Sequence, residues 1–537
     1  MGRQVIGIDL GTTNSVVATV DDSGRVTVLP NASGGQLTPS VVYFEANGTA
    51  IVGGPAVRAT AVDPDNGIRL VKRHMGTDFP LDVRGEQHSP ESVSALILRQ
   101  LVSAALGGQQ GEKISAVITV PAYFGMAERE ATHQAGVIAG LDVLELLDEP
   151  VSAASHYGLT ADGDRTVLVY DLGGGTFDTT VLRVEDGTVR VLATDGHHEL
   201  GGADVDGRLL DLVLRRLGDQ LPAGEVEDLT DDEERLGELT LDVEAAKKDL
   251  ADQPSRQVTV STPQGRVAVT ITRRDLDEAC ADLYSTTEEI IRRVLGAAGL
   301  PDGRGIDEVI MVGGSSRIAA LAPRLTRMLG KVPQLVEPDL AVAKGAALRA
   351  HHLAGTQQMT ALTRARGGGE AHGFQSMSRH AGAQAGPGAV TPVTPRAVGI
   401  LIEDSHDPTG QRSFIEHLVL ANTPLPVERA EHRFGTILPN QGSARIQVYE
   451  QAGELRSPEV EHNRRVLDGE LTGLGKLPAG SVIRITLRIA VDGRLTVVAH
   501  EPRSGRELTL EAFVEGVIDS AETERLTKLV GMTKVRG

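Results

Sequence analysis

Two stretches of the sequence, far apart, repeat one pattern. The stretch IGIDLGTTNSVV (6–17) and the stretch VYDLGGGTFDTT (169–180) each run from apolar residues into Asp-Leu-Gly, then through small residues and Thr into apolar residues again. A Gly-rich segment after a strand often belongs to a dinucleotide site or a P-loop, but both need a helix directly after the glycines. Here the residues that follow, 15–29 and 179–194, have the pattern of strand, turn and strand. Each copy is therefore predicted to be the tip of a β-hairpin.

Two hairpin tips of this composition can hold phosphate groups from opposite sides. Because glycine has no side chain, the backbone N–H groups of such a tip can approach a phosphate closely. Asp9 and Asp171 stand just before the two tips, and a carboxylate there can hold a hydrated Mg²⁺ that bridges the phosphates. The alternative, two unrelated glycine turns, does not explain why Asp, Leu, Gly and Thr recur in the same order. The repeat predicts a duplicated domain with a nucleotide clamped between its halves.

The repeat lies in a region, residues 1–354, that has the pattern of an α/β domain. Short apolar runs of the buried-strand type, such as 115–124 and 165–174, alternate with helical patterns at 126–141 and 233–252. A chain of 537 residues is too long for one core and should divide into at least two domains.

The composition changes after this region. Residues 355–392 are rich in Gly and Ala without periodicity, which predicts a flexible linker. In 482–500 apolar and polar residues alternate on either side of the turn pair Asp492-Gly493, the pattern of a β-hairpin. We expect a β domain over 393–511, followed at 512–537 by one short helix.

Charge and composition limit the classes of partner. The formal net charge is −20, which argues against nucleic acid or an anionic membrane as the main partner. The one cysteine, Cys280, excludes an internal disulfide and a multi-cysteine zinc site, and its helical surroundings predict a small packed residue. No apolar run reaches the roughly 18 residues of a membrane span, and the N-terminus lacks the apolar core of a signal peptide. We expect a soluble cytoplasmic protein.

Several motifs together resemble one known family. IGIDLGTTNS, VPAYF, DEPVSAASHYG, VYDLGGGTFD, LGGADVDGRL and VGGSSRI occur in that order within residues 4–350. They resemble the actin-like ATPase domain of the seventy-kilodalton heat-shock chaperones, the DnaK family. The region 393–511 resembles the substrate-binding β-sandwich of that family through VTPRAVGI, LANTPLP and DGRLTVVAHEPRSGRE. The implied fold is an α/β actin-like ATPase domain of two duplicated lobes, followed by a mostly antiparallel β-sandwich.

The resemblance implies that ATP is hydrolysed slowly in a cleft between the two lobes. Lys72 matches the lysine that neutralises charge in phosphoryl transfer, and Glu149 matches the acid near the attacking water. Asp171 and Thr176 are the other catalytic candidates. The implied phosphate loops are Gly11, Thr12, Thr13 and Asn14 in the first tip and Gly173, Gly174, Gly175 and Thr176 in the second. Asp9, Asp171 and Asp178 would position Mg²⁺ and its waters, and K⁺ is a further ion that the resemblance allows.

A second set of residues would contact the adenosine. Glu244, Lys247 and Lys248 share one helix face at spacings i, i+3 and i+4, which by composition alone is most often an exposed ion-pair face. By resemblance that face meets the ribose and base. The other implied nucleotide contacts are Gly201, Gly202, Gly313, Gly314, Ser315, Arg317 and Asp339. The family has Ser where this chain has Ala251, which removes a hydroxyl that could bond the purine.

The chain departs from the family in four further ways. The segment between Lys72 and the VPAYF motif is shorter, so one lobe should be trimmed. The short apolar linker with its acidic residue is replaced by the Gly-rich stretch, which puts coupling between the domains in question. Glu145 occupies a position that is basic in the bacterial family, and the reversed charge would oppose docking of a J-domain co-chaperone. The chain stops at Gly537, where the family adds a helical lid, so faster peptide release is expected.

These observations predict an ATP-dependent, chaperone-like protein whose β domain binds extended apolar segments of unfolded clients. Pro121 and Arg129 match the family's relay between the ATP cleft and that domain, although Pro121 is equally consistent with a strand end. Ile415, Ile437 and Ala444 fall near the peptide pocket or in plain sandwich core. A J-domain co-chaperone and a nucleotide-exchange factor are the implied partners. The alternatives are an ATP-sensing scaffold with one specific partner and, less favoured, a sugar kinase of the same superfold.

Overall fold

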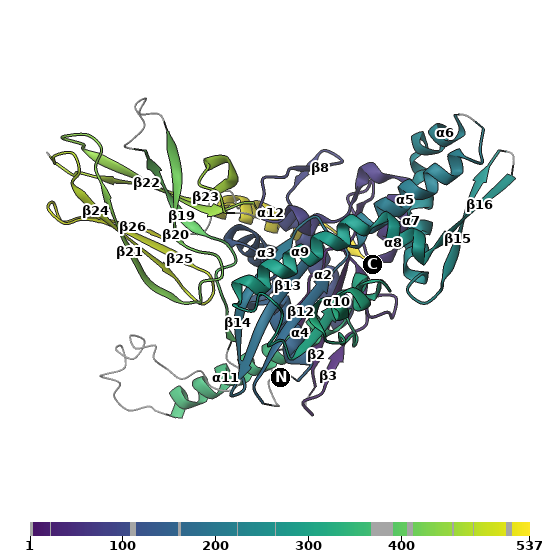
Figure 1. Ribbon diagram of the computed structural model, residues 1–537, viewed down its shortest axis with the longest axis horizontal. Coiled ribbons are helices and arrows are strands. Elements are labelled where there is room, and N and C mark those ends of the chain that lie inside the picture. Colours follow the sequence, from purple (N-terminus) through teal and green to yellow (C-terminus); the bar gives the residue numbers. More distant parts are fainter. Residues whose placement is uncertain are drawn as a thin grey trace.

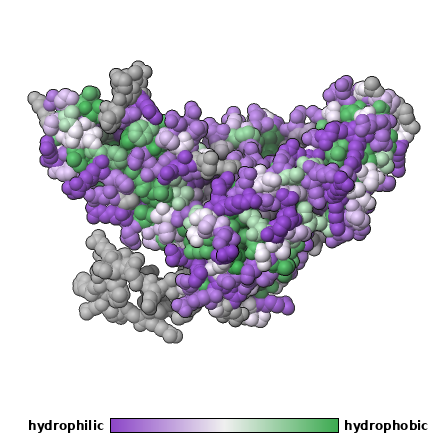
Figure 2. Space-filling model, viewed as in Figure 1, coloured by the Kyte–Doolittle hydropathy of each residue, from purple (hydrophilic) through white to green (hydrophobic). Residues whose placement is uncertain are grey.

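The computed structural model describes residues 4–21, 23–107, 114–158, 163–222, 224–263, 265–366, 390–404, 412–453, 456–475, 477–511 and 518–537. Two α/β lobes form the centre and right of the molecule in Figure 1, and a β domain lies at the left. Polar residues cover most of the face seen in Figure 2, in keeping with the net charge of −20. Within these ranges, no helix is both long enough and apolar enough to cross a membrane.

Lobe I is built on a six-stranded mixed sheet. Its order is β11-β10-β1-β2-β3, and β4 also pairs with β2. The strands are β1 (Val5–Asp9), β2 (Asn14–Val20), β3 (Val26–Val28), β4 (Thr38–Pro39), β10 (Ser115–Val120) and β11 (Asp142–Asp148). Helices α2 (Pro90–Leu106) and α3 (Met126–Ile138) pack on it, since Leu96 and Ala131 share a buried cluster with Ile6 and Ile118.

The outer part of lobe I consists of short strands and short helices. It contains a four-stranded sheet in the order β27-β6-β5-β7 and a two-stranded sheet, β8-β9. Its elements are β5 (Val42–Phe44), β6 (Ala50–Val52), α1 (Gly54–Val62), η1 (Pro64–Asn66), β7 (Gly67–Ile68), η2 (Val71–His74), β8 (Leu81–Val83), β9 (Glu86–His88) and β27 (Val535–Arg536).

Lobe II is built on a five-stranded sheet in the order β17-β12-β13-β14-β18. The strands are β12 (Arg165–Leu172), β13 (Phe177–Glu185), β14 (Thr188–His197), β17 (Glu308–Val312) and β18 (Val390–Thr391). The remaining elements are α5 (Gly202–Gly218), α6 (Glu225–Asp231), α7 (Glu233–Asp249), β15 (Ser255–Thr262), β16 (Gly265–Thr272), α8 (Arg273–Ala279), α9 (Ala281–Ala297), η3 (Gly314–Arg317) and α10 (Leu321–Leu329). Cys280 is fully buried in the core of this lobe, which confirms that it is a packed residue.

The two lobes repeat one strand arrangement. In lobe I, β1, β2 and β3 form an antiparallel meander and β10 joins β1 in parallel. In lobe II, β12, β13 and β14 form the corresponding meander and β17 joins β12 in parallel. The two Asp-Leu-Gly motifs occupy the equivalent β1–β2 and β12–β13 connections, which confirms the prediction of two hairpin tips in a duplicated fold.

Helices α4 (Glu149–His156) and α11 (Ala341–Arg366) pack together beside the lobe I sheet. A Cβ atom at Gly345 of α11 would lie 1.8 Å from Ser152 O of α4, and one at Gly7 of β1 would lie 2.1 Å from Ala347 N of α11. The side chain of Ser152 donates a hydrogen bond to Val342 O at 2.6 Å. Glycine at these positions thus allows α11 to lie directly on both elements.

The β domain is a sandwich of two four-stranded antiparallel sheets, ordered β20-β19-β22-β23 and β21-β24-β25-β26. Ile483, Ile485, Leu487 and Ile489 are all buried, as the alternation predicted, and Asp492-Gly493 lies in the turn between β24 and β25. The elements are β19 (Val398–Glu403), β20 (Ser413–Val419), β21 (Val427–Gly435), β22 (Ser443–Gln451), η4 (Val460–His462), β23 (Asn463–Thr472), β24 (Val482–Ile489), β25 (Leu495–Glu501) and β26 (Arg506–Glu511).

The predicted linker, 355–392, is wrong at both ends. Helix α11 continues to Arg366, because the residues after 354 include strong helix formers such as Ala, Leu, Gln and Arg. At the other end, β18 pairs in parallel with β14, with Val390 opposite Val189. Residues 367–389 lie outside the described residues. The predicted C-terminal helix is present as α12 (Ser520–Met532), but it packs on lobe I rather than standing apart.

Candidate active site

The two hairpin tips meet face to face. Residues 10–13 connect β1 to β2, and residues 173–176 connect β12 to β13. A Cβ atom at Gly174 would lie 2.0 Å from Thr13 Oγ1, and one at Gly175 would lie 2.2 Å from Thr12 Cγ2. Only glycine therefore lets the second tip approach the first this closely.

Each tip is held by its own lobe. In lobe I, Ser40 donates its N–H to Thr13 O and its hydroxyl to Gly11 O, both at 2.8 Å. In lobe II, the start of α5 donates two N–H groups to the second tip, Gly202 N to Gly173 O at 3.0 Å and Ala203 N to Gly174 O at 2.7 Å. The backbone of Gly202 and Ala203 thus supports the second tip.

Lys72 and Glu149 form a buried ion pair beside the tips. Lys72 lies in η2, Glu149 is the first residue of α4, and Lys72 Nζ is 2.7 Å from Glu149 Oε1. The two side chains are only 5% and 10% exposed, and the Lys72 ammonium also lies 5.7 Å from the centre of the Phe124 ring. Lys72 is therefore not a solvated surface lysine but one partner of a buried ion pair.

Three aspartates lie together beside this pair. Asp171 and Asp178 are buried, and Asp9 is partly buried. Burial, and then the Glu149 carboxylate, raise the pKa of Asp9 to about 7, while Lys72 opposes the rise. The pKa of Asp171 is raised well above its ordinary range by burial, followed by Glu149 and Asp178. The pKa of Asp178 is raised in the same way, although Ala122 N donates to its Oδ2 at 2.6 Å.

This cluster holds more carboxylates than ammonium groups. Asp9, Asp171, Asp178 and Glu149 face a single lysine, Lys72. Carboxylate oxygens are the ligands that Mg²⁺ prefers, and Mg²⁺ usually keeps several of its waters. In the described part of the chain, no three His, Cys, Asp or Glu side chains are arranged to ligate a metal directly. This set of carboxylates would suit a divalent cation such as Mg²⁺.

Arg73, next to Lys72, is a residue that the sequence analysis missed. Its Nε donates to Gly175 O at 2.9 Å, and its Nη2 donates to Asp204 Oδ2 at 2.6 Å. Asp204 in turn accepts from Gly201 N at 2.7 Å. Arg73 thus reaches from lobe I to the second tip and to the support of that tip in lobe II. The only signal in the sequence was its position beside Lys72.

Comparison with known proteins gives one consistent result. The model of the family described as "Hsp70 protein" matches residues 5–363. The chaperone protein DnaK of Thermotoga neapolitana is 36% identical over 516 residues, which cover 94% of this chain and 80% of the relative. The DnaK of Thermotoga petrophila is 35% identical over 97% of this chain and 82% of the relative, and that of Thermosipho melanesiensis is 35% identical over 94% and 79%. The chain belongs to the Hsp70 family.

In this Hsp70, the helix face predicted to contact adenosine forms hydrogen bonds and ion pairs with other parts of the protein. Lys247 donates to Gly202 O at 2.9 Å and to Asp206 Oδ2 at 2.7 Å, so it supports the start of α5. Glu244 pairs with Lys248 at 2.7 Å and lies 3.7 Å from Arg69 Nη2 of lobe I. Lys248 is therefore an exposed ion-pair residue, as the composition of this face predicted. Glu244, in contrast, also approaches Arg69 of lobe I.

The loop from β17 to η3 lies against the second aspartate. Gly313 has a φ of +79°, and a Cβ atom there would lie 2.5 Å from Asp171 Oδ1. A Cβ atom at Gly314 would lie 2.6 Å from Asp339 Oδ1, and Arg317 Nη2 donates to Asp339 Oδ2 at 2.7 Å. A Cβ atom at Gly202 would lie 2.4 Å from the Ser315 hydroxyl. The structure thus brings these predicted nucleotide contacts together with the two hairpin tips.

Arg129, one of the two predicted relay residues, lines a cavity between lobe I and the β domain. Arg129 of α3 donates to Asp148 Oδ1 and, at 3.0 Å, to Phe124 O in the turn after Pro121. Glu145 pairs with Arg349 Nε at 2.9 Å. Arg129, Asp148, Glu145 and Arg349 lie on the wall of a cavity of about 790 Å³, which the turn between β24 and β25 closes on the other side.

Proposed function

We propose that this Hsp70-family chain binds and hydrolyses ATP and uses its β domain to hold extended apolar segments of unfolded polypeptides. One observation carries the proposal: the two hairpin tips converge on the buried pair of Lys72 and Glu149 and on three aspartates whose pKa values are raised, chiefly by burial. The named relatives are chaperones. An ATPase of the cytoplasm remains the expectation from the sequence.

The residues of the site suit phosphoryl transfer, which needs positioning and charge stabilisation more than covalent chemistry. Backbone N–H groups of both tips and the hydroxyls of Thr12, Thr13 and Thr176 would bind phosphate oxygens. The Lys72 ammonium would stabilise the negative charge that develops as the terminal phosphate leaves. The Glu149 carboxylate, held by Lys72, would orient the attacking water and accept its proton.

Asp9, Asp171 and Asp178 would hold Mg²⁺ through its waters, and the ion would neutralise phosphate charge when bound. Because burial favours their protonated forms, these carboxylates would release protons as the cation binds. Glu244, Lys247 and Lys248, with Gly313, Gly314, Ser315, Arg317 and Asp339, would contact ribose and base.

Exposed apolar side chains on the β domain support the binding of apolar peptides. Ile437 and Leu438, which follow β21, are 49% and 64% exposed, and Val482 opposite Gly435 of β21 is also exposed. Ile415 and Ala444, in contrast, are buried. Of the three predicted pocket residues, only Ile437 is exposed, and we propose that it contacts the peptide together with Leu438 and Val482.

Two measurements test the proposal. Single-turnover ATP hydrolysis should be readily detected in the wild type and slowed about 10²-fold or more in Glu149→Gln, with the exposed Glu234→Gln as the matched control. The release of a fluorescent apolar peptide should be severalfold faster in ATP than in ADP. Hydrolysis without any peptide binding would support a scaffold with another partner, and the absence of hydrolysis would overturn the proposal.

A further inference from the structure

Three charged side chains lie where the β domain meets lobe I, and we call them the interface cluster. Glu450 of β22 and Arg396, which comes just before β19, belong to the β domain, and Glu128 lies in the first turn of α3. Glu450 is only 1% exposed. Arg396 Nη2 lies 2.8 Å from Glu128 Oε1, and these two side chains are 16% and 15% exposed. The interface cluster thus contains two carboxylates and one guanidinium.

The carboxylate of Glu450 lies directly against the start of α3. Met126 N donates to its Oε1 at 3.1 Å and to its Oε2 at 3.2 Å. A Cβ atom at Gly125 would lie 2.5 Å from Glu450 Oε2, so glycine at this position lets the carboxylate reach the backbone. Arg396, the cation of the interface cluster, pairs with Glu128. Glu450 is therefore held by a backbone N–H of lobe I.

Apolar side chains from both domains surround this contact. Ala127 of α3 is completely buried and belongs to the same cluster as Val398 and Val448 of the β domain, and Met126 packs against that cluster. An ionised carboxylate in such surroundings costs more free energy than a protonated one. Burial accordingly raises the pKa of Glu450 to about 7, whereas Arg396 opposes the rise and Glu128 adds to it.

The other charged or titratable groups near Glu450 include two arginines and a phenol. Arg464 of β23 opposes the rise in the pKa of Glu450 less than Arg396 does, and Arg129 of α3 is engaged by Asp148. Burial raises the pKa of Tyr123, which precedes α3, well above its ordinary range, so the phenol stays neutral. Because arginine keeps its proton in proteins, neither the arginines nor the phenol change charge near neutral pH.

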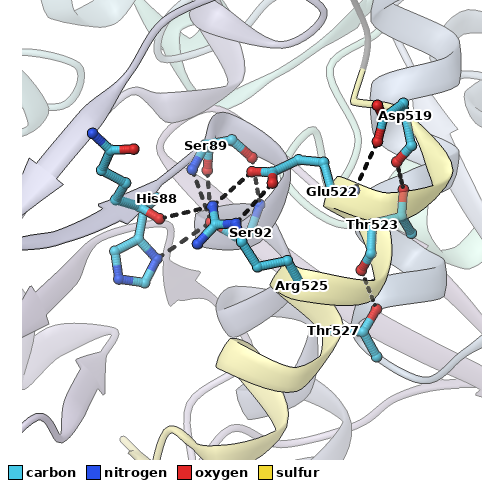
Figure 3. A network of polar contacts seen from close by, with 9 residues as sticks. His88, Ser89, Ser92, Asp519, Glu522, Thr523, Arg525 and Thr527 are labelled. Carbon is cyan, nitrogen blue, oxygen red and sulfur yellow. Dashed lines mark hydrogen bonds and ion pairs between the residues drawn. The ribbon is translucent and has the colours of Figure 1, made fainter.

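Two imidazoles at the contacts with the lobes respond to pH in the opposite sense. Burial lowers the pKa of His198 of lobe II, and Arg396 adds to this decrease. Figure 3 shows Arg525 pointing from α12 toward the start of α2, and burial, followed by this charge, lowers the pKa of His88 to about 4. Protonation of either imidazole at low pH would therefore weaken these contacts. A contact that becomes stronger at low pH needs a different group.

We propose that docking of the β domain on lobe I takes up one proton from solvent at Glu450, so that lower pH favours the docked arrangement. In a released β domain the carboxylate would be in contact with water and would ionise more readily. A group whose pKa is raised in one state stabilises that state at low pH, and the stabilisation is lost as the pH rises through the raised value. The inference goes beyond the proposed function, because it depends on the contact between the domains and not on ATP hydrolysis.

Hydrogen exchange of the Met126 amide tests the proposal. This N–H is bonded to Glu450 in the docked protein and, at the first position of α3, has no acceptor within the helix after release. Its protection, corrected for the intrinsic effect of pH on exchange, gives the docking constant even where nearly all molecules are docked. Glu450→Gln keeps an oxygen acceptor but cannot ionise. The docking constant of this variant, divided by that of the wild type, should rise about tenfold from pH 6 to pH 8.

The matched control is Glu470→Gln, an exposed position on β23, for which the same ratio should not change with pH. The comparison is made without nucleotide and with saturating ADP or ATP. A ratio for Glu450→Gln that is independent of pH would overturn the proposal. Absence of protection at Met126 in every state would overturn it as well, because the contact would then not form. Neither result requires ATP hydrolysis, so failure of this inference and failure of the proposed function are distinguishable.

Energy transfer between two dyes checks that the whole domain responds. Arg274→Cys in lobe II and Glu507→Cys in the β domain are exposed attachment points. The natural Cys280 is buried, which raises the pKa of its thiol to about 12 and protects it from labelling. The docked fraction of the wild type should fall relative to that of Glu450→Gln between pH 6 and pH 8. Equal fractions at both pH values would confine the proton to a local contact and would contradict the proposal.

Removal of the cation gives the sharpest variant. Arg396→Met leaves the two carboxylates of the interface cluster without their guanidinium, so Glu450 should keep its proton to higher pH. Its docking constant should then fall by up to about 100-fold from pH 6 to pH 8, the limit for one proton, compared with about tenfold in the wild type. The exposed Arg488→Met on β24 should behave like the wild type. An unchanged pH dependence in Arg396→Met would show that Glu450 does not titrate within the interface cluster, which would also overturn the proposal.

Discussion

The two hairpin tips share a sequence pattern and a place in the fold, yet they are built differently. The first tip has one glycine, Gly11, and presents the side chains of Thr12 and Thr13, whereas the second has three glycines in a row at 173–175. The threonines of the first tip occupy the space that side chains on the second would need, with Thr13 Oγ1 at 2.0 Å from a Cβ atom at Gly174. The tips are therefore complementary rather than equivalent.

Their supports differ in the same way. The first tip is held within lobe I by Ser40 alone among the contacts described above. The second is held by its own lobe at the start of α5 and also from the opposite lobe by Arg73. A movement between the lobes would therefore act on the second tip more than on the first. The duplication supplies two hairpin tips, and the asymmetry gives the second tip a direct contact with the opposite lobe.

The largest expected effect comes from the positive charge of Lys72, which lies beside the tips. Lys72→Met keeps most of the side-chain volume but removes the ammonium from the buried acidic cluster. Single-turnover hydrolysis should fall about 10²- to 10³-fold, the usual effect of losing one charge-stabilising group. Rapid-quench assays of the bound nucleotide measure this directly, and circular dichroism checks the fold. A rate within twofold of the wild type would mean that Lys72 is structural.

The next effect tests the complementarity of the tips. Gly174→Ala places a Cβ atom 2.0 Å from Thr13 Oγ1, so the tips must separate, and a shift of about 1 Å can reduce a rate about 10²-fold. The double variant Gly174→Ala with Thr13→Gly should recover part of the rate, because it returns the space to the second tip. Gly207→Ala is the matched control, since a Cβ atom there meets nothing within 4 Å. Equal losses in the single and double variants would contradict the complementarity.

The pattern of residues could predict the tips because local sequence decides them. Apolar runs on both sides of Asp-Leu-Gly specify strands, and the absence of a helical pattern after the glycines excludes a P-loop. The resemblance implied that Lys72 and Glu149 belong to one site, and in the structure they form an ion pair. The alternation around Asp492-Gly493 likewise predicted the β24–β25 hairpin.

The pattern could not predict contacts between distant elements. Arg73 donates hydrogen bonds to Gly175 and Asp204, which are more than 100 positions away and come close to it only because the two lobes meet. Leu526 and Val530 have the i, i+4 spacing of an apolar helix face, which predicts that something covers them but not that lobe I does. The predicted linker began too early. The average composition of 355–392 is rich in Gly and Ala, and it concealed the helix formers among the first residues, which continue α11 to Arg366.

A smaller effect is expected from the cross-lobe support of the second tip. Arg73→Ala removes the hydrogen bonds to Gly175 O and Asp204 but leaves the first tip unchanged. ATP affinity and turnover should each fall by roughly tenfold, the lower end of the range for losing a hydrogen bond to a charged group. Amides at 173–176 should exchange faster than in the wild type while those at 10–13 do not. Arg73→Lys should be intermediate and the exposed Arg274→Ala silent; equal acceleration at both tips would refute the asymmetry.

The smallest expected effect concerns Asp9, the aspartate that precedes the first tip. Burial raises the pKa of Asp9 to about 7 from an unfolded value near 3.8, so between these pH values the folded protein binds more protons than the unfolded chain. Stability should therefore fall as the pH rises from about 4 to about 7, and Asp9→Asn, which cannot ionise, should lose this part of the dependence. Without Mg²⁺ or nucleotide, the melting temperature of Asp9→Asn relative to the wild type should be roughly 2–4 °C higher at pH 8 than at pH 5. Thermal melts at both pH values measure this difference, and added Mg²⁺ with ATP should reduce it, because the cation stabilises the ionised carboxylate that only the wild type has. A difference that does not change with pH would mean that Asp9 is ionised throughout and that the negative charge at the first tip is already balanced by Lys72.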